Sequence, residues 1–149
     1  MKKQEHFRVA AVKALKPYRL SLTFGDGATM TVDLAAIIDR IPALALLKDP
    51  KLFAKARVGE WGLTVDWIPG ELDMAGDNLR AEAVEQSGGI SHERIWEWMH
   101  RNGLTLDTAA EALGISRRML AYYRSGQKPI PRHIWLACLG WEAERHKAA

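Results

Sequence analysis

The sequence LTLDTAAEALGISRRMLAYYRSG, residues 104–126, predicts two short helices joined by a tight turn. Thr105 or Asp107 can begin the first helix, because a short polar side chain there accepts a hydrogen bond from the first helical turn. Gly114 interrupts the pattern and suits a left-handed backbone, and Ser116 can cap the second helix. Apolar residues recur at helical spacing on both sides of the turn: Leu106, Ala109, Ala110 and Leu113 before it, and Met119, Leu120 and Tyr123 after it.

Three apolar side chains in this segment suit two helices that cross at close range. Ala110 is small enough to let the helices approach each other, and Ile115 can fill the inside of the turn. Leu120, four residues after Ser116, can anchor the second helix against the first. Helices packed in this way leave the amino-terminal end of the second helix projecting, ready to enter the major groove of DNA.

The segment resembles the helix-turn-helix domains of the phage-repressor/Cro family, also called the xenobiotic-response-element family. The residues that match the family's pattern are Leu104, Thr105, Ala110, Leu113, Gly114, Ile115, Ser116, Leu120, Gly126, Lys128 and, one place early, Pro129. The resemblance covers roughly residues 90–139. Two positions depart from the pattern, since Leu106 replaces a common phosphate-binding glutamine and Arg124 replaces a common acid.

The resemblance implies roles for the exposed face of the second helix. The residues expected to face base pairs are Arg117, Arg118, Ala121 and Tyr122. The residues expected to contact phosphates, which fix register without reading sequence, are Ser116, Arg124, Lys128 and Arg132. The local charge agrees, because residues 116–132 hold five basic side chains and no acidic one.

The N-terminal part, residues 1–86, is predicted to be a small mixed α+β domain. Strands are expected at Val9–Leu15, Tyr18–Phe24, Thr29–Leu34, Ala56–Val58 and Gly62–Val65, and short helices at Leu34–Arg40 and Lys51–Lys55. A hairpin turn is expected at Gly25–Gly27, and the sheet region is expected to end at Trp67–Gly70.

Several stretches of this part resemble a small bacterial α+β domain of uncharacterised function. They are Val12–Leu15, Tyr18–Gly27, Val32–Leu34, Leu52–Phe53 and Asp66–Trp67. That family occurs alone, fused to a helix-turn-helix, or encoded beside toxin-like proteins. Its motifs are turn and core residues, so the resemblance implies a fold and no chemistry.

The C-terminal part, residues 87–149, is predicted to be all helical, after a flexible joint at Gln86–Gly89. A helix is expected to begin after Ser91 and to stop at Asn102–Gly103, and a last helix is expected at Arg132–His146. Trp96 and Trp98 cannot face the same way on one helix, so one of them is expected to contact the other domain or a second subunit.

The composition excludes several classes of protein. Of 149 residues, 48% are hydrophobic and 26% are charged, which is typical of a folding chain. The single cysteine, Cys138, cannot form an internal disulfide and fits a reducing cytoplasm. Polar residues at 4–6 replace the apolar run of a signal peptide, and no apolar run approaches the ~20 residues of a membrane helix. The whole net charge of +3 lies in residues 87–149.

No catalytic, cofactor-binding or metal-binding residue is predicted, and the chain is not expected to be an enzyme. His92, Glu93 and His100 lack the spacing of a zinc-protease helix, because Trp96 stands where the second histidine should be. The carboxylates that gather in sequence around an expected solvated loop are Asp66, Glu71, Asp73 and Asp77.

The sequence therefore predicts an α+β protein: a small N-terminal mixed α+β domain plus a C-terminal all-α, repressor-like helix-turn-helix domain. Its expected function is sequence-specific binding of double-stranded DNA as a cytoplasmic homodimer and transcriptional regulator, with a recognition helix at about Ser116–Arg124. One alternative is an antitoxin-like module that binds a toxin-like protein and its own promoter. Another is an enzyme with a carboxylate site near Asp66, Glu71 or Asp73, which a bound metal ion would indicate.

Overall fold

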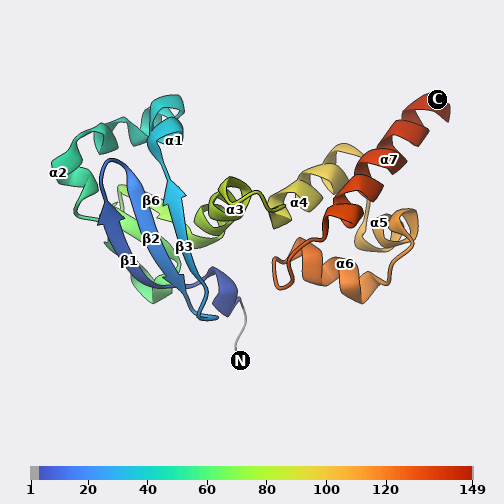
Figure 1. Cartoon of the computed structure of the whole chain (residues 1–149), viewed down its shortest axis with the longest axis horizontal. Helices are drawn as coiled ribbons and strands as arrows, with labels where there is room; N and C mark the ends of the chain where they lie inside the picture. Colours follow the sequence, from blue (N-terminus) through green and yellow to red (C-terminus); the bar gives the residue numbers. More distant parts are fainter. Residues whose placement is uncertain (1–3, 149) are drawn as a thin grey trace. The chain divides into compact units, whose positions relative to one another are not determined.

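The chain has a mixed α+β architecture and divides into two compact units, Met1–Ser87 and Gly88–Ala149. The computed structural model describes residues 4–148. The first unit holds both β-sheets, and in the described part of the second the only regular elements are helices (Figure 1). Among residues 4–148, no helix is both long enough and apolar enough to cross a lipid bilayer.

A three-stranded antiparallel sheet opens the first unit. After a short 3-10 segment, η1 (Glu5–Phe7), come the strands β1 (Val9–Leu15), β2 (Arg19–Phe24) and β3 (Thr29–Asp33), in the order β1-β2-β3. Side chains alternate along a strand, so Leu20, Leu22 and Phe24 of β2 all enter the core, as their spacing predicts. The predicted hairpin turn is present, with Gly27 at a φ of 88°.

Three short helical segments follow β3, namely α1 (Ala35–Arg40), η2 (Pro42–Lys48) and α2 (Pro50–Phe53). An aspartate satisfies an orphan N–H at the start of two of them. Asp33 Oδ1 accepts a hydrogen bond from the Ala35 N–H at 2.9 Å, and Asp49 Oδ1 accepts one from the Lys51 N–H at 3.0 Å. The helix expected at Lys51–Lys55 therefore begins at Pro50, as a proline at the first helical position allows, and ends at Phe53.

The second antiparallel sheet extends further than the sequence predicts. Its strands are β4 (Arg57–Val58), β5 (Thr64–Ile68) and β6 (Leu72–Ala75), in the order β4-β5-β6, with η3 (Glu60–Gly62) between the first two. The expectation that Trp67–Gly70 ends the sheet is wrong. Gly70, at a φ of 76°, turns the chain back, and the Glu71 N–H donates to the Ile68 carbonyl at 2.9 Å. The Pro-Gly pair is a hairpin turn, and its second strand is only four residues long.

Helix α3 (Gly76–Gln86) begins directly after β6 and is not predicted from the sequence. Its first residues, glycine, aspartate and asparagine, are typical of a loop. Gly76 is required by packing, because a Cβ there would meet the carbonyl of Phe7. Asp73 and Asp77 thus lie in a strand and a helix, and the expected solvated loop shrinks to the exposed turn that holds Glu71. At its other end, α3 is tied to β3 by two hydrogen bonds of 2.8 Å between Gln86 and the backbone of Asp33.

Each unit has its own hydrophobic core, as two separately folding domains require. The first core joins the two sheets to the helical segments, and the indole of the buried Trp67 donates to the Phe53 carbonyl at 3.0 Å. Its largest fully buried side chains are Phe24, Leu20, Leu22, Leu34, Leu47, Leu79, Val32 and Val65.

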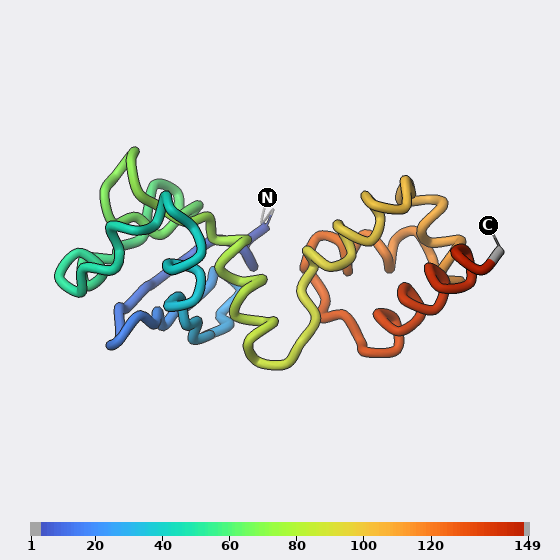
Figure 2. Tube along the Cα trace, turned by 90° about the horizontal axis from the view of Figure 1, so that it is seen from above, coloured from blue at the N-terminus to red at the C-terminus, as the bar shows by residue number. Residues whose placement is uncertain are grey.

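The second unit consists of four helices, α4 (His92–Arg101), α5 (Leu106–Leu113), α6 (Arg117–Arg124) and α7 (Arg132–Ala148), whose course is traced from yellow to red in Figure 2. Trp98 is completely buried, and its indole donates to the Cys138 carbonyl at 3.0 Å. Trp96, two residues away, is 56% exposed, so the two tryptophans face opposite ways as predicted. Burial raises the pKa of the Cys138 thiol to about 12, which leaves it a packed, unreactive side chain.

The end of α4 is fixed to α7 by a polar cluster. Asn102 and Arg101 both donate to the carboxylate of Glu142, at 2.8 Å and 2.9 Å. The hydrogen bond from Asn102, together with that from Arg101, lowers the pKa of the Glu142 carboxyl below its ordinary value. Arg145 also donates to the Asn102 carbonyl at 2.9 Å. These contacts hold α7 with one face toward α4 and the opposite face outward.

Candidate nucleic-acid interface

The residues that connect α5 to α6 form a tight, fully capped turn. Thr105 accepts a hydrogen bond from the Thr108 N–H at 3.1 Å, and the Thr105 N–H donates to Thr108 Oγ1 at 2.8 Å, which is a reciprocal capping box. Gly114 ends α5 at a φ of 69°. Ser116 Oγ then accepts the Met119 N–H at 3.1 Å and starts α6. Of the two residues predicted to begin α5, Thr105 is therefore the cap, and Gly114 and Ser116 end and start the helices as predicted.

Small and apolar side chains let α5 and α6 pack closely. Ala109 and Ala110 are buried in α5, and Leu120 is buried in α6. Ile115 lies against the same core from within the turn, and its N–H donates to the Ala110 carbonyl at 3.1 Å. This packing leaves the first turn of α6 outside the core, because Ser116, Arg117 and Arg118 are all exposed.

Three of the predicted contact residues lie together on the surface of α6 and the loop after it. The Arg118 Nε–H donates to the Tyr122 hydroxyl at 2.9 Å, and its guanidinium carbon lies 5.6 Å from the centre of the Tyr122 ring. Lys128 Nζ lies 4.6 Å from the same ring. We call Arg118, Tyr122 and Lys128 the Tyr122 cluster. It places two cations around one aromatic ring, at a separation set by cation–π contacts.

Arg117 makes a different contact, across the turn. Its Nε lies 3.0 Å from Asp107 Oδ1, and both side chains are largely exposed. The sequence predicts Asp107 only as a residue that can begin α5, and its pairing with Arg117 is not readable from the sequence. The two residues are ten positions apart, and only the turn at Gly114 brings them together.

Arg124 does not join the Tyr122 cluster. Its guanidinium lies over the ring of Trp96 from α4, at 5.7 Å, beside a cavity of about 150 Å³ that Thr105 and His100 also line. Of the other predicted residues, Ser116 serves as the α6 cap, Ala121 is half-buried, and Arg132 is the exposed first residue of α7. The predicted residues thus fall into separate groups along α6 and beyond it.

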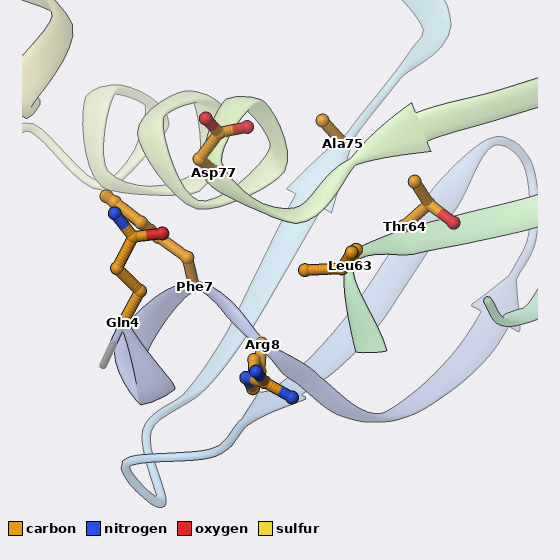
Figure 3. Close-up of a pocket in the computed structure, with 7 residues that line it drawn as sticks. All are labelled: Gln4, Phe7, Arg8, Leu63, Thr64, Ala75 and Asp77. Atoms are coloured by element: carbon orange, nitrogen blue, oxygen red, sulfur yellow. The ribbon is translucent and has the colours of Figure 1, made fainter. Parts of the chain in front are cut away.

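A larger cavity, of about 320 Å³, lies in the first unit (Figure 3). Arg8 and Asp77 border it on different sides, with Phe7 and Leu63 between them. Both charged groups have partners close by: Arg8 donates to the Trp61 carbonyl at 3.2 Å, and Asp77 Oδ1 accepts the Asn78 N–H at 2.8 Å. Among the described residues, no group of three or more histidine, cysteine, aspartate or glutamate side chains is arranged to hold a metal ion.

The sequence of the first unit identifies the protein family. Residues 9–85 match the family described as "Protein of unknown function (DUF2442)", and the chain belongs to this family. The match covers β1 to α3, which includes both sheets.

One solved structure is similar to the chain over both units. It is the crystal structure of a "Putative DNA Binding Protein" from Nitrosomonas europaea ATCC 19718, with 53% sequence identity and a TM-score of 0.86. The similarity covers 93% of this chain and 88% of that one. No curated protein matches the sequence.

Proposed function

We propose that this protein binds double-stranded DNA in a sequence-specific manner and regulates transcription as a homodimer in the cytoplasm. In this proposal α5 and α6 are the two helices of a helix-turn-helix, and α6 is the recognition helix. The observation that carries it is the exposed, arginine-bearing first turn of α6, held out by a capped turn and a buried helix crossing. The N. europaea protein described as DNA-binding, at 53% identity, supports the same class of function.

Base contacts are proposed for the outward residues of the recognition helix. Arg117 and Arg118 can each donate two parallel hydrogen bonds to O6 and N7 of a guanine, worth about 1–3 kcal/mol of discrimination per contact. The hydrogen bond to Tyr122 already restrains the Arg118 side chain in the free protein, so less conformational entropy is lost when Arg118 binds a base. Ala121 presents a methyl group on the same helix, which suits contact with a thymine methyl.

Phosphate contacts are proposed for the flanks of that helix. Lys128 and Arg132 are exposed cations in and after the loop that follows α6. Ser116 lies at the amino-terminal end of α6, where backbone N–H groups and the helix dipole favour an anion. Arg124, stacked on Trp96, is a preoriented cation at the opposite end of the helix. Such contacts set register and orientation, and they bind all sequences alike.

The test is selection of binding sites from a randomised pool of DNA duplexes by the full-length protein, followed by titration of the selected duplex. The wild-type protein should enrich a pseudo-palindrome with half-sites about one helical turn apart, ~34 Å. Arg118→Gln should lose preference at one base pair per half-site by about 1–3 kcal/mol while keeping its affinity for unrelated duplexes.

Lys55→Gln is a matched control, because it removes an exposed cation from the first unit. Either of two results would contradict the proposal: the wild-type protein enriches no sequence, or Arg118→Gln keeps the same base preference as the wild type.

A further inference from the structure

We propose that the outer face of α7 is the surface through which two copies of this chain pair. We define this face by Leu136, Leu139, Gly140 and Ala143, which are all exposed. The two leucines are 49% and 41% exposed, whereas Ile134 and Cys138 on the opposite side of the helix are buried. Residues at spacings of three and four share one side of a helix, so the exposed residues form one continuous apolar stripe.

Gly140 lies in the middle of the 17-residue helix α7, where glycine is a poor choice. A Cβ at this position would meet no atom within 4 Å, and Gly140 is absent from the glycines with positive φ. Nothing within the described chain therefore requires a glycine here. A glycine on an apolar helix face does serve one purpose. Because it has no side chain, a second helix can approach closely and pack its own side chains against the glycine.

A second copy of α7 fits this face in an antiparallel arrangement. If the two helices cross near residue 138, Leu136 lies opposite the partner's Gly140, and a two-fold axis repeats the contact on the other side. The same register sets Glu144 opposite the amino-terminal end of the partner helix, which carries Arg132 and His133. The surface thus complements itself in shape, with a leucine over a glycine, and in charge, with an acid facing basic residues.

The small area of this face limits the affinity of the dimer. One helix from each protomer gives an interface at or below the low end of the range for specific complexes, roughly 1,200 Å² of total buried surface. The dimer should therefore dissociate on dilution. The inference deepens the proposed function, since a two-fold pair would present two copies of α6, but it is tested without DNA.

The experiment is sedimentation velocity of the full-length protein over about a hundredfold range of concentration. The wild-type protein should pass from monomer to dimer, and Leu136→Glu should stay monomeric throughout. Leu46→Glu is the matched control, because Leu46 is a 62% exposed leucine in the first unit, and this variant should dimerise like the wild type.

Gly140→Leu separates a binding role from a folding role. The added side chain favours the helix and meets nothing in the monomer, so the melting temperature of the dilute protein should rise. Dimerisation should nevertheless weaken by about tenfold or more, since the leucine fills the space needed by the partner helix. Glu144→Lys should also weaken it, and more so at low salt.

Two results would overturn the inference: a wild-type protein that is monomeric at every concentration, or a dimer that Leu136→Glu does not weaken. The first result would also be obtained if another part of the same chain covered the face. Failure here is separable from failure of the proposed function. A monomer that still selects a DNA sequence through Arg118 contradicts the dimer surface and the homodimer, but leaves base recognition by α6 standing. A dimer that selects no sequence contradicts only sequence-specific DNA binding.

Discussion

At the scale of single residues, the contacts of Arg117 and Arg118 differ in a way that matters for binding. Arg118 is held by Tyr122, a neutral partner that leaves its positive charge available. Arg117 is held by Asp107, whose carboxylate cancels that charge locally. Because the Arg117–Asp107 pair is exposed to water, it stabilises the free protein by only about 0–1 kcal/mol. Breaking the Arg117–Asp107 pair when Arg117 binds DNA therefore costs little free energy.

Asp107→Asn should accordingly tighten DNA binding. The change releases Arg117 and removes a negative charge beside this proposed base contact, so affinity for the selected duplex should rise several-fold at low salt. Fluorescence anisotropy titration measures the effect. Glu111→Gln, which removes an exposed carboxylate from the same helix, should have a smaller effect. A loss of affinity in Asp107→Asn would instead mean that Asp107 orients Arg117 for its base contact.

At the scale of elements, the unit formed by α5, the turn and α6 depends on the backbone of Gly114. Its φ of 69° lies in the left-handed region, which costs a residue with a Cβ roughly 1 kcal/mol or more. No atom lies within 4 Å of the position of a Cβ there, so the strain is conformational and not steric.

Gly114→Ala should therefore destabilise the second unit by about 1 kcal/mol, with little change in the first. Gly114→Asn should be milder, because asparagine tolerates the left-handed region better than alanine does. Urea unfolding of the full chain, followed by circular dichroism, measures both variants. Equal stability of Gly114→Ala and the wild type would show that the turn relaxes to another conformation.

Sequence patterns predict the elements of the second unit well, above all α5 and α6, because both helices have a strong local signal at their ends. Thr105, Gly114 and Ser116 stand at the caps where the sequence places them. The end of the first unit has weaker signals in the sequence. The strand β6 is short, and α3 opens with loop-forming residues whose helical state depends on distant contacts, such as that of Gly76 with the Phe7 carbonyl. The pairing of Arg117 with Asp107, and of Arg124 with Trp96, likewise depends on tertiary packing.

At the scale of the whole molecule, charge and fold divide along the same boundary. The first unit carries as many acidic as basic residues, and the net charge of +3 belongs to the helical second unit. A neutral unit attached to a basic one is expected to leave electrostatic attraction to DNA to the basic part alone. Since α7 of the second unit is the proposed pairing surface, we expect the first unit, which has its own core, to serve partner binding or ligand sensing.

The salt dependence of DNA affinity tests whether only the second unit contributes electrostatic attraction. It also reports how many protomers bind one duplex. Each phosphate neutralised by a lysine or arginine changes the slope of log affinity against log salt by about −0.9. If two protomers bind, Lys128→Gln should make the slope less steep by about 2, and if one binds, by about 1. Lys55→Gln in the first unit should leave the slope unchanged.

Because Lys128 is proposed to contact only phosphate, Lys128→Gln should lower the affinity for the selected duplex and for an unrelated duplex equally. A larger loss of affinity for the selected duplex would mean that Lys128 takes part in reading bases.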